Sequence, residues 1–187
     1  MSEYFILGQD KQQAGGPIIE NYPDDLDILD LISGKKLDRT MEPIVIELAE
    51  SSGDFRPDMV TYLLPLFSDK LKNILTDLGI DNIDYYPVIF SNQASEKEDT
   101  KYWLANILGL IQCLDIENSE TSTHPLSKKV KIEKSFILDE SLLSGQKIFR
   151  IAEERSLIII NEDIKNQLDN QQLQGVRVIN TRDYEGY

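Results

Sequence analysis

Histidine and cysteine, two residue types that often carry chemistry in enzymes, are nearly missing from this sequence. Its 187 residues include one histidine, His124, and one cysteine, Cys113. A single cysteine excludes an intramolecular disulfide, and its apolar neighbours at 111–114 predict a small buried side chain. His124 lies in a polar, Ser/Thr-rich stretch that predicts a surface loop. The common zinc sites need about four His, Cys or carboxylate ligands, and one histidine with one cysteine cannot build them.

Sequence motifs for catalysis, membrane insertion and export are missing as well. There is no G-x-S-x-G, no P-loop and no G-x-G-x-x-G. No apolar run approaches the ~20 residues of a membrane helix, and the N-terminus lacks the basic flank and apolar core of a signal peptide. We therefore expect a cytoplasmic protein that does not bind a membrane, is not an enzyme, and needs no metal or other cofactor.

Basic residues are scarce relative to acidic ones. The chain has 19 of the former and 33 of the latter, a net charge of −14. Residues 1–100 hold 8 bases and 20 acids, so 8 − 20 gives −12, and residues 101–187 hold 11 and 13, so 11 − 13 gives −2. Such a field repels nucleic acids and anionic membranes and attracts a basic protein. The alternative is that the acids only keep the protein soluble.

One short cluster of lysines stands against this trend, at Lys128, Lys129, Lys131 and Lys134. Lysines are common on exposed strand edges, where they discourage pairing between sheets of different molecules. We interpret the cluster as such an edge and expect no nucleic-acid partner.

The apolar pattern indicates short strands and two capped helices. Helices are predicted after Ser68 and Asn161, because each is a good N-cap followed by acidic residues in the first turn. Residues 91–100 are polar and charged, which predicts a loop, and residues 27–31 fit either a strand or a single helical turn. Strands are predicted at residues 4–7, 44–48, 83–90, 102–108, 148–151, 157–160 and 176–179.

An internal repeat links the two predicted helices. Residues 67–73 resemble residues 160–166, and the offset of 93 continues into the apolar segments that follow. Each helix must lay its apolar stripe on a sheet, so we expect an α+β fold with short strands in a mixed or antiparallel sheet and two equivalent amphipathic helices. The chain, 1–187, is then a single domain. It consists either of two similar halves, about 1–100 and 101–187, or of two helices at equivalent places on a shared sheet.

Two acidic segments provide the candidate partner-binding residues. The first lies in residues 20–30, which include five acids and no base, and the second lies in the predicted loop before Tyr102. Tyrosine is a favoured interface anchor, and acids around it suit a basic partner. The first segment lacks the spacing of an EF-hand, so we expect solvated acids there. The residues expected to contact the partner are Asp24, Asp25, Asp27, Glu96, Glu98, Asp99 and Tyr102.

The order of several segments resembles a known family. The segments that carry the resemblance are 65–71, 79–88, 102–107, 113–120, 138–141, 148–151, 159–162 and 175–176. They resemble the eleventh family of immunity proteins in bacterial polymorphic-toxin systems, and the resemblance covers roughly residues 34–179. Members of such families are expressed beside a toxin and protect the producing cell by binding it. The resemblance therefore implies an inhibitor with a cognate toxin or effector as its partner, and it implies no catalytic residues.

The charge and the resemblance lead to one leading hypothesis and two alternatives. The leading hypothesis is an immunity protein that neutralises its toxin by stoichiometric binding. A carboxylate-dependent hydrolase or metal enzyme is the first alternative, and it requires a deep pocket where several acids converge. An acidic nucleic-acid mimic is the second, and it requires acids spaced along one face at phosphate-like intervals.

Overall fold

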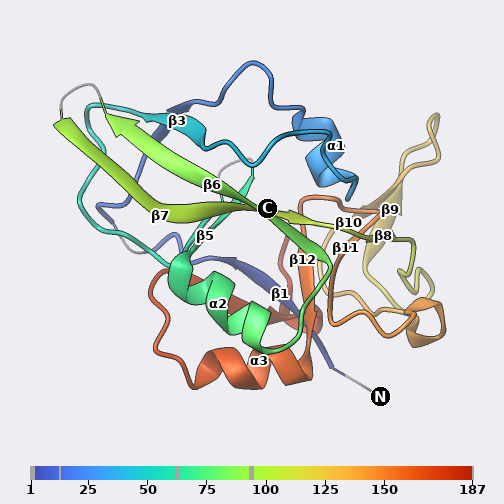
Figure 1. The fold of residues 1–187 in the computed structure, drawn as a ribbon. Coiled ribbons are helices and arrows are strands. Elements are labelled where there is room, and N and C mark those ends of the chain that lie inside the picture. The colour runs from blue at the N-terminus through green and yellow to red at the C-terminus, as the bar shows by residue number, and fades with distance from the viewer. Residues whose placement is uncertain (1–2, 13, 62–63, 93–94, 187) are drawn as a thin grey trace.

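Three β-sheets and a pair of amphipathic helices build the fold, shown by a computed structural model in Figure 1. The structure describes residues 3–12, 14–61, 64–92 and 95–186, with the backbone alone at 95–101. Sheet 1 has six strands in the order β2-β3-β6-β7-β5-β4, and sheet 2 has five in the order β13-β1-β12-β11-β8. Strands β9 and β10 form a separate hairpin. Both sheets are mixed and the strands are mostly short, so the predicted α+β class is confirmed.

The elements have the following bounds. The strands of sheet 1 are β2 (Ile19–Asn21), β3 (Ile44–Leu48), β4 (Met59–Thr61), β5 (Pro65–Ser68), β6 (Ile83–Asn92) and β7 (Ser95–Ile107). Those of sheet 2 are β1 (Tyr4–Gln9), β8 (Leu110–Ile111), β11 (Ile148–Ile151), β12 (Ile158–Asn161) and β13 (Val176–Asn180). The remaining elements are β9 (Thr121–Thr123), β10 (Val130–Ile132), α1 (Ile28–Ile32), α2 (Asp69–Asp77), α3 (Glu162–Asp169) and the 3-10 helices η1 (Glu140–Leu142) and η2 (Thr181–Asp183).

The two predicted helices, α2 and α3, are confirmed, and they begin in the same way. The Ser68 hydroxyl accepts a hydrogen bond from the backbone N–H of Leu71, and the Asn161 side chain accepts one from the N–H of Ile164, both at 3.1 Å. Acidic residues occupy the first turn of each helix, where they complement the positive end of the helix dipole. The helix α2 ends before Gly79, whose φ of +71° suits glycine.

Each copy of the repeat folds into the same strand–helix–strand unit. In sheet 1, β7 lies between β5 and β6 and is antiparallel to both, and in sheet 2, β1 lies between β12 and β13 in the same way. The register agrees as well, because Tyr85 pairs with Ala105 as the equivalent Val178 pairs with Leu7. The neighbouring strand β4 pairs with β5 as β11 pairs with β12. The repeat is therefore a four-stranded unit with one helix, present twice.

The two units are interleaved along the chain. Strand β1, at the N-terminus, completes the second unit, whereas β7 runs through residue 100 and completes the first. A division at about residue 100 would therefore separate strands of the same unit. The sequence offset of 93 does not relate β7 to β1, although they occupy equivalent places in the two units. The reason is that β7 follows its helix α2 in the chain, whereas β1 precedes its helix α3.

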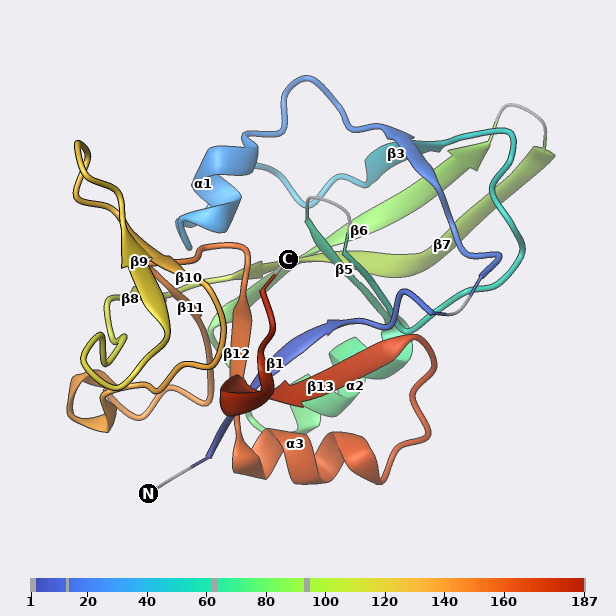
Figure 2. The ribbon, with the colours of Figure 1, turned by 180° about the vertical axis from the view of Figure 1, so that it is seen from behind.

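The two units share one hydrophobic core between their sheets and helices. Figures 1 and 2 show α2 and α3 side by side beneath the sheets. Leu71 and Leu75 of α2 and Ile164 and Leu168 of α3 are buried in a single apolar cluster with residues of both sheets. The other face of sheet 1 packs on a second cluster that includes α1, and the other face of sheet 2 packs on a third.

One local prediction needs correction. Residues 91–100 were expected to form a loop, but β6 continues to Asn92 and β7 begins at Ser95, so the strands extend into a long hairpin (Figure 1). Cross-strand backbone pairing overrides the polar composition of this segment. Pro87 lies in β6 inside sheet 1, directly before a register shift between Val88 and Phe90.

We predict equal losses of stability from equivalent truncations in the two helices. Leu75→Ala and Leu168→Ala each remove a side chain that is at most 4% exposed, so each should lower the free energy of unfolding by about 2–5 kcal/mol. The control Leu126→Ala removes a side chain that is 89% exposed and should change it by less than about 0.5 kcal/mol. Urea denaturation followed by circular dichroism measures all three. A large loss from only one helix variant would contradict the shared core.

Candidate functional site

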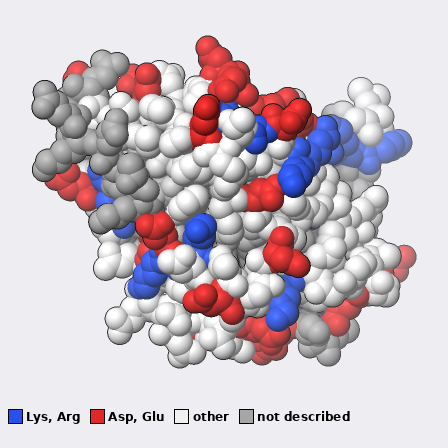
Figure 3. Space-filling view, in the orientation of Figure 1, with Lys and Arg blue, Asp and Glu red and all other residues white. Residues whose placement is uncertain are grey.

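Several acidic side chains lie along the segment that leads from β2 to α1. Asp24, Asp25 and Asp27, all expected to bind a partner, are exposed there. Figure 3 shows acidic side chains gathered over α1 and the upper edge of the molecule. The segment is held in place from within, because the apolar side chains of Leu26 and Leu31 are buried in the second cluster, on the outer face of sheet 1. Alternation of buried leucines with acids thus turns the carboxylates outward.

Part of this acidic charge is offset locally. Asp25 forms an ion pair with Arg39 at 2.9 Å, and Asp30 forms one with Lys35 at 2.5 Å. Asp27 caps α1 by accepting a hydrogen bond from the backbone N–H of Asp30. Surface ion pairs of this kind contribute little to stability, at most about 1 kcal/mol. These carboxylates can therefore exchange their local partners for contacts with another protein.

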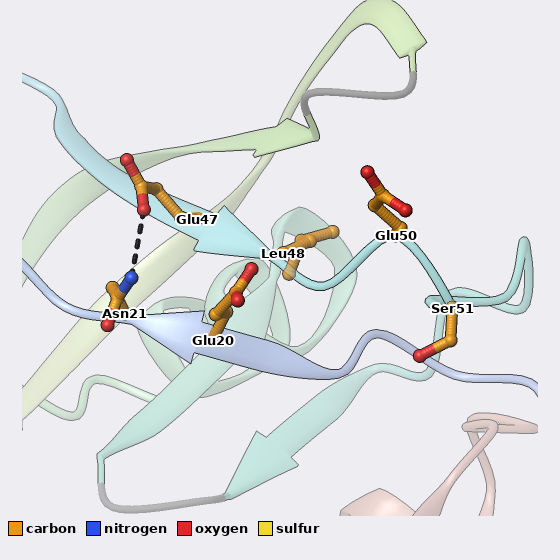
Figure 4. A pocket seen from close by; sticks show the side chains of 6 residues that line it. All are labelled: Glu20, Asn21, Glu47, Leu48, Glu50 and Ser51. Atoms are coloured by element: carbon orange, nitrogen blue, oxygen red, sulfur yellow. Dashed lines mark hydrogen bonds between the residues drawn. The ribbon is translucent and has the colours of Figure 1, made fainter.

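A surface pocket of about 490 Å³ adjoins the start of this segment (Figure 4). Glu20 of β2, Glu47 of β3 and the following Glu50 line it, and all three are exposed. Glu47 accepts a hydrogen bond from the side chain of Asn21 at 3.0 Å, while the carboxylates of Glu20 and Glu50 lie apart from it in Figure 4. The pocket extends the acidic surface from the 20–30 segment onto β3. Within the described residues, no three His, Cys, Asp or Glu side chains form a group able to hold a metal ion.

The second expected cluster, Glu96, Glu98 and Asp99, lies on the strand β7 rather than in a loop. Its side chains fall outside the described part of the structure. Tyr102, expected to be an exposed anchor beside it, is only 2% exposed, and its hydroxyl donates a hydrogen bond to the carbonyl of Pro57 at 2.5 Å. The alternating pattern of β7 turns Tyr102 toward the core, where it packs on Phe90. The expectation that Tyr102 is an exposed anchor is therefore wrong.

The single cysteine and the single histidine have the surroundings that the sequence predicts. Cys113 is fully buried, and burial, followed by the charges of Glu153 and Asp139, raises the pKa of its thiol to about 12. A thiol with so high a pKa is a poor nucleophile. His124 is exposed at the turn of the β9–β10 hairpin, where its Nδ1 accepts backbone hydrogen bonds from Leu126 and Ser127.

The lysine cluster lies on the same β9–β10 hairpin. Lys128, Lys129, Lys131 and Lys134 are exposed, and Lys131 pairs with Glu133 at 2.9 Å. The hairpin is a two-stranded sheet of its own, so lysines on an exposed strand edge, as interpreted from the sequence, match this position.

Sequence reasoning missed two features of the acidic surface. Glu47 and Glu50 join the 20–30 segment because β2 pairs with β3, a contact that no local pattern signals. Leu29 is 70% exposed among the acids of α1 and offers an apolar contact in a charged setting. In the sequence, Leu29 lies close to Ile28 and Leu31 and looks like a core residue. In the structure, α1 turns Leu31 toward the core and Leu29 toward solvent.

The fold and the site define an α+β protein whose first repeat unit carries an acidic outer surface. Its family is the Imm11 immunity protein family, whose model matches residues 7–183, and the chain belongs to that family. Membership confirms the resemblance drawn from the sequence, and it implies a toxin-neutralising role and a cognate toxin as the partner. Among curated proteins, none matches the sequence significantly.

The helices of the described residues are short. None of them has both the length and the apolar character that a membrane-spanning helix requires, and α2, with nine residues, illustrates the point.

We predict that Cys113 resists thiol reagents in the folded protein. At about pH 8, a pKa of about 12 leaves roughly one thiolate in ten thousand, and the side chain is also inaccessible. Labelling with Ellman's reagent should therefore require unfolding and should follow the unfolding rate. A rapid stoichiometric reaction with the native protein would contradict the buried, protonated thiol.

Proposed function

We propose that the protein neutralises its cognate toxin by stoichiometric binding, in the cytoplasm of the producing cell, and performs no chemistry itself. The observation that carries the proposal is the match of the Imm11 family to nearly the whole chain, residues 7–183. An immunity protein needs a surface that fits one partner, and the acidic surface of the 20–30 segment and β3 is the surface best suited to that role.

Charge supports the choice of this surface. Residues 1–100 carry 12 of the 14 net negative charges, and the exposed Asp24, Asp25 and Asp27 lie among them. Complementary charge accelerates association with a basic protein and selects against acidic partners. Exposed Leu29 adds an apolar contact that a partner can desolvate, which is where binding energy concentrates in an interface.

The surroundings of the reactive side chains support a binding role over catalysis. The thiol of Cys113 is buried with a raised pKa, and His124 is held by backbone hydrogen bonds in an exposed turn. The glutamates around the pocket of Figure 4 spread over its rim instead of facing a common point. The second acidic cluster, Glu96, Glu98 and Asp99, remains part of the proposed surface on grounds of sequence alone.

Charge substitution on the 20–30 segment tests the proposed surface. The triple variant Asp24→Lys, Asp25→Lys, Asp27→Asn removes the negative charge and keeps a capping side chain at position 27. We expect the Kd for the toxin encoded beside this gene to rise at least about tenfold, mostly through slower association, and the salt dependence of binding to weaken. Surface plasmon resonance over a range of salt concentrations measures both.

A matched control separates local charge from total charge. Glu117→Lys with Glu120→Lys reverses two exposed acids in the segment between β8 and β9, and this variant should bind almost as tightly as the wild type. If both variants weakened toxin binding equally, the effect would come from the net charge of the protein and not from the 20–30 segment. Unchanged affinity and salt dependence in the triple variant would exclude the 20–30 segment from the interface.

A further inference from the structure

A large pocket lies between the two repeat units, away from the acidic surface. It has a volume of about 910 Å³ and is lined by strands of both sheets. On the side of sheet 2, strand register places Arg150, Ile158, Leu7 and Val178 in one row across β11, β12, β1 and β13. Directly paired residues point to the same face of a sheet, so these four side chains form a continuous floor.

Sheet 1 supplies the opposite wall of this inter-unit pocket. Thr61, Leu64 and Pro65 from β4, β5 and their connection line it. Gln9 joins the two walls, because its side-chain oxygen accepts a hydrogen bond from the backbone N–H of Thr61 at 2.9 Å. The pocket thus combines apolar surfaces with polar and charged groups, and its volume lies in the range of small-molecule sites.

Arg150 is the unusual member of this lining. It is only 2% exposed, and its Nη1 donates a hydrogen bond to the carbonyl of Arg155 at 2.7 Å. Its buried Nε has no hydrogen-bond partner, and none of the described carboxylates pairs with the guanidinium. Burial alone lowers the pKa of Arg150 to about 10. A guanidinium has five N–H donors in a planar fork, and leaving a donor such as Nε unpaired in the interior is costly.

The fold itself does not require an arginine here. The equivalent strand of the first unit is β4, where pairing of Met59 with Phe67 matches pairing of Ile148 with Ile160. Position 150 therefore corresponds to Thr61, a small uncharged residue. The first unit has the same architecture with no charge at this position, so the repeat itself does not require the charge of Arg150.

We propose that the inter-unit pocket binds a small amphipathic oxyanion, a carboxylate or a phosphate ester, whose head pairs with Arg150. The planar fork of arginine matches two oxygens of either head group. The apolar part of the ligand packs on Leu7, Ile158 and Pro65. The charged side chains of the rim are mixed in sign, with Asp183, Glu185, Lys11 and Arg177 exposed and Asp10 half-buried, so the buried Arg150 is the group that favours an anionic head deep in the pocket. This site is separate from the proposed toxin-binding surface and does not depend on it.

Calorimetric titration of the full chain with matched probes tests the site. Octanoate and octyl phosphate, kept below their micellar concentrations, distinguish the two head groups, and octanol has the same chain without a charge. We expect saturable 1:1 binding of at least one anionic probe and at least tenfold weaker binding of octanol. Arg150→Met should weaken that binding at least tenfold, while Arg182→Met, which removes an exposed arginine outside the pocket lining, should leave it unchanged.

Folding of each variant is checked by circular dichroism before titration. If Arg150→Met does not fold, Arg150→Lys keeps the charge without the fork and should still weaken binding several-fold. Failure of both anionic probes to bind, equal binding of octanol, or full affinity in a folded Arg150 variant would overturn the proposal. Since the toxin takes no part in these titrations, their outcome is independent of the immunity role.

Discussion

The shared core beneath the two sheets is the constraint on which the rest of the structure depends. Each helix is short, and an isolated helix of eight or nine residues is not stable in water. Each gains its stability by burying one apolar stripe, at about 1.5–3 kcal/mol for each fully buried leucine or isoleucine. Because α2 and α3 bury their stripes in the same cluster, neither unit has a complete core alone. We infer that the interleaved units fold together as a single domain.

Functional differences arise where the two units stop being equivalent. The first unit is extended by β3 and β2, with α1 packed on the outer face of sheet 1, and these additions carry the exposed acids. The second unit is extended at its other edge by β8. At the junction, Arg150 replaces the threonine of its counterpart position. The repeat thus serves as a common scaffold, while the acidic surface and the buried arginine are departures from the repeat.

Local sequence signals predicted the helices and many strands correctly, because caps such as Ser68 and Asn161 act within one turn. They also placed Asp24, Asp25 and Asp27 on the surface. They failed where pairing between strands that are distant in the sequence determines the structure. Residues 91–92 and 95–100 are polar yet belong to the paired strands β6 and β7, and Tyr102 is buried because β7 crosses the middle of sheet 1. The pocket around Arg150 needs strands from both ends of the chain, so no local pattern could reveal it.

We propose that the acidic additions to the first unit bind the toxin. Hydrogen–deuterium exchange of the protein alone and in its toxin complex tests this proposal, because it maps the interface without assuming any residue. We expect the strongest added protection at residues 18–31 and 44–50. Protection confined to α2, α3 and the β9–β10 hairpin, with no change in those two segments, would contradict it.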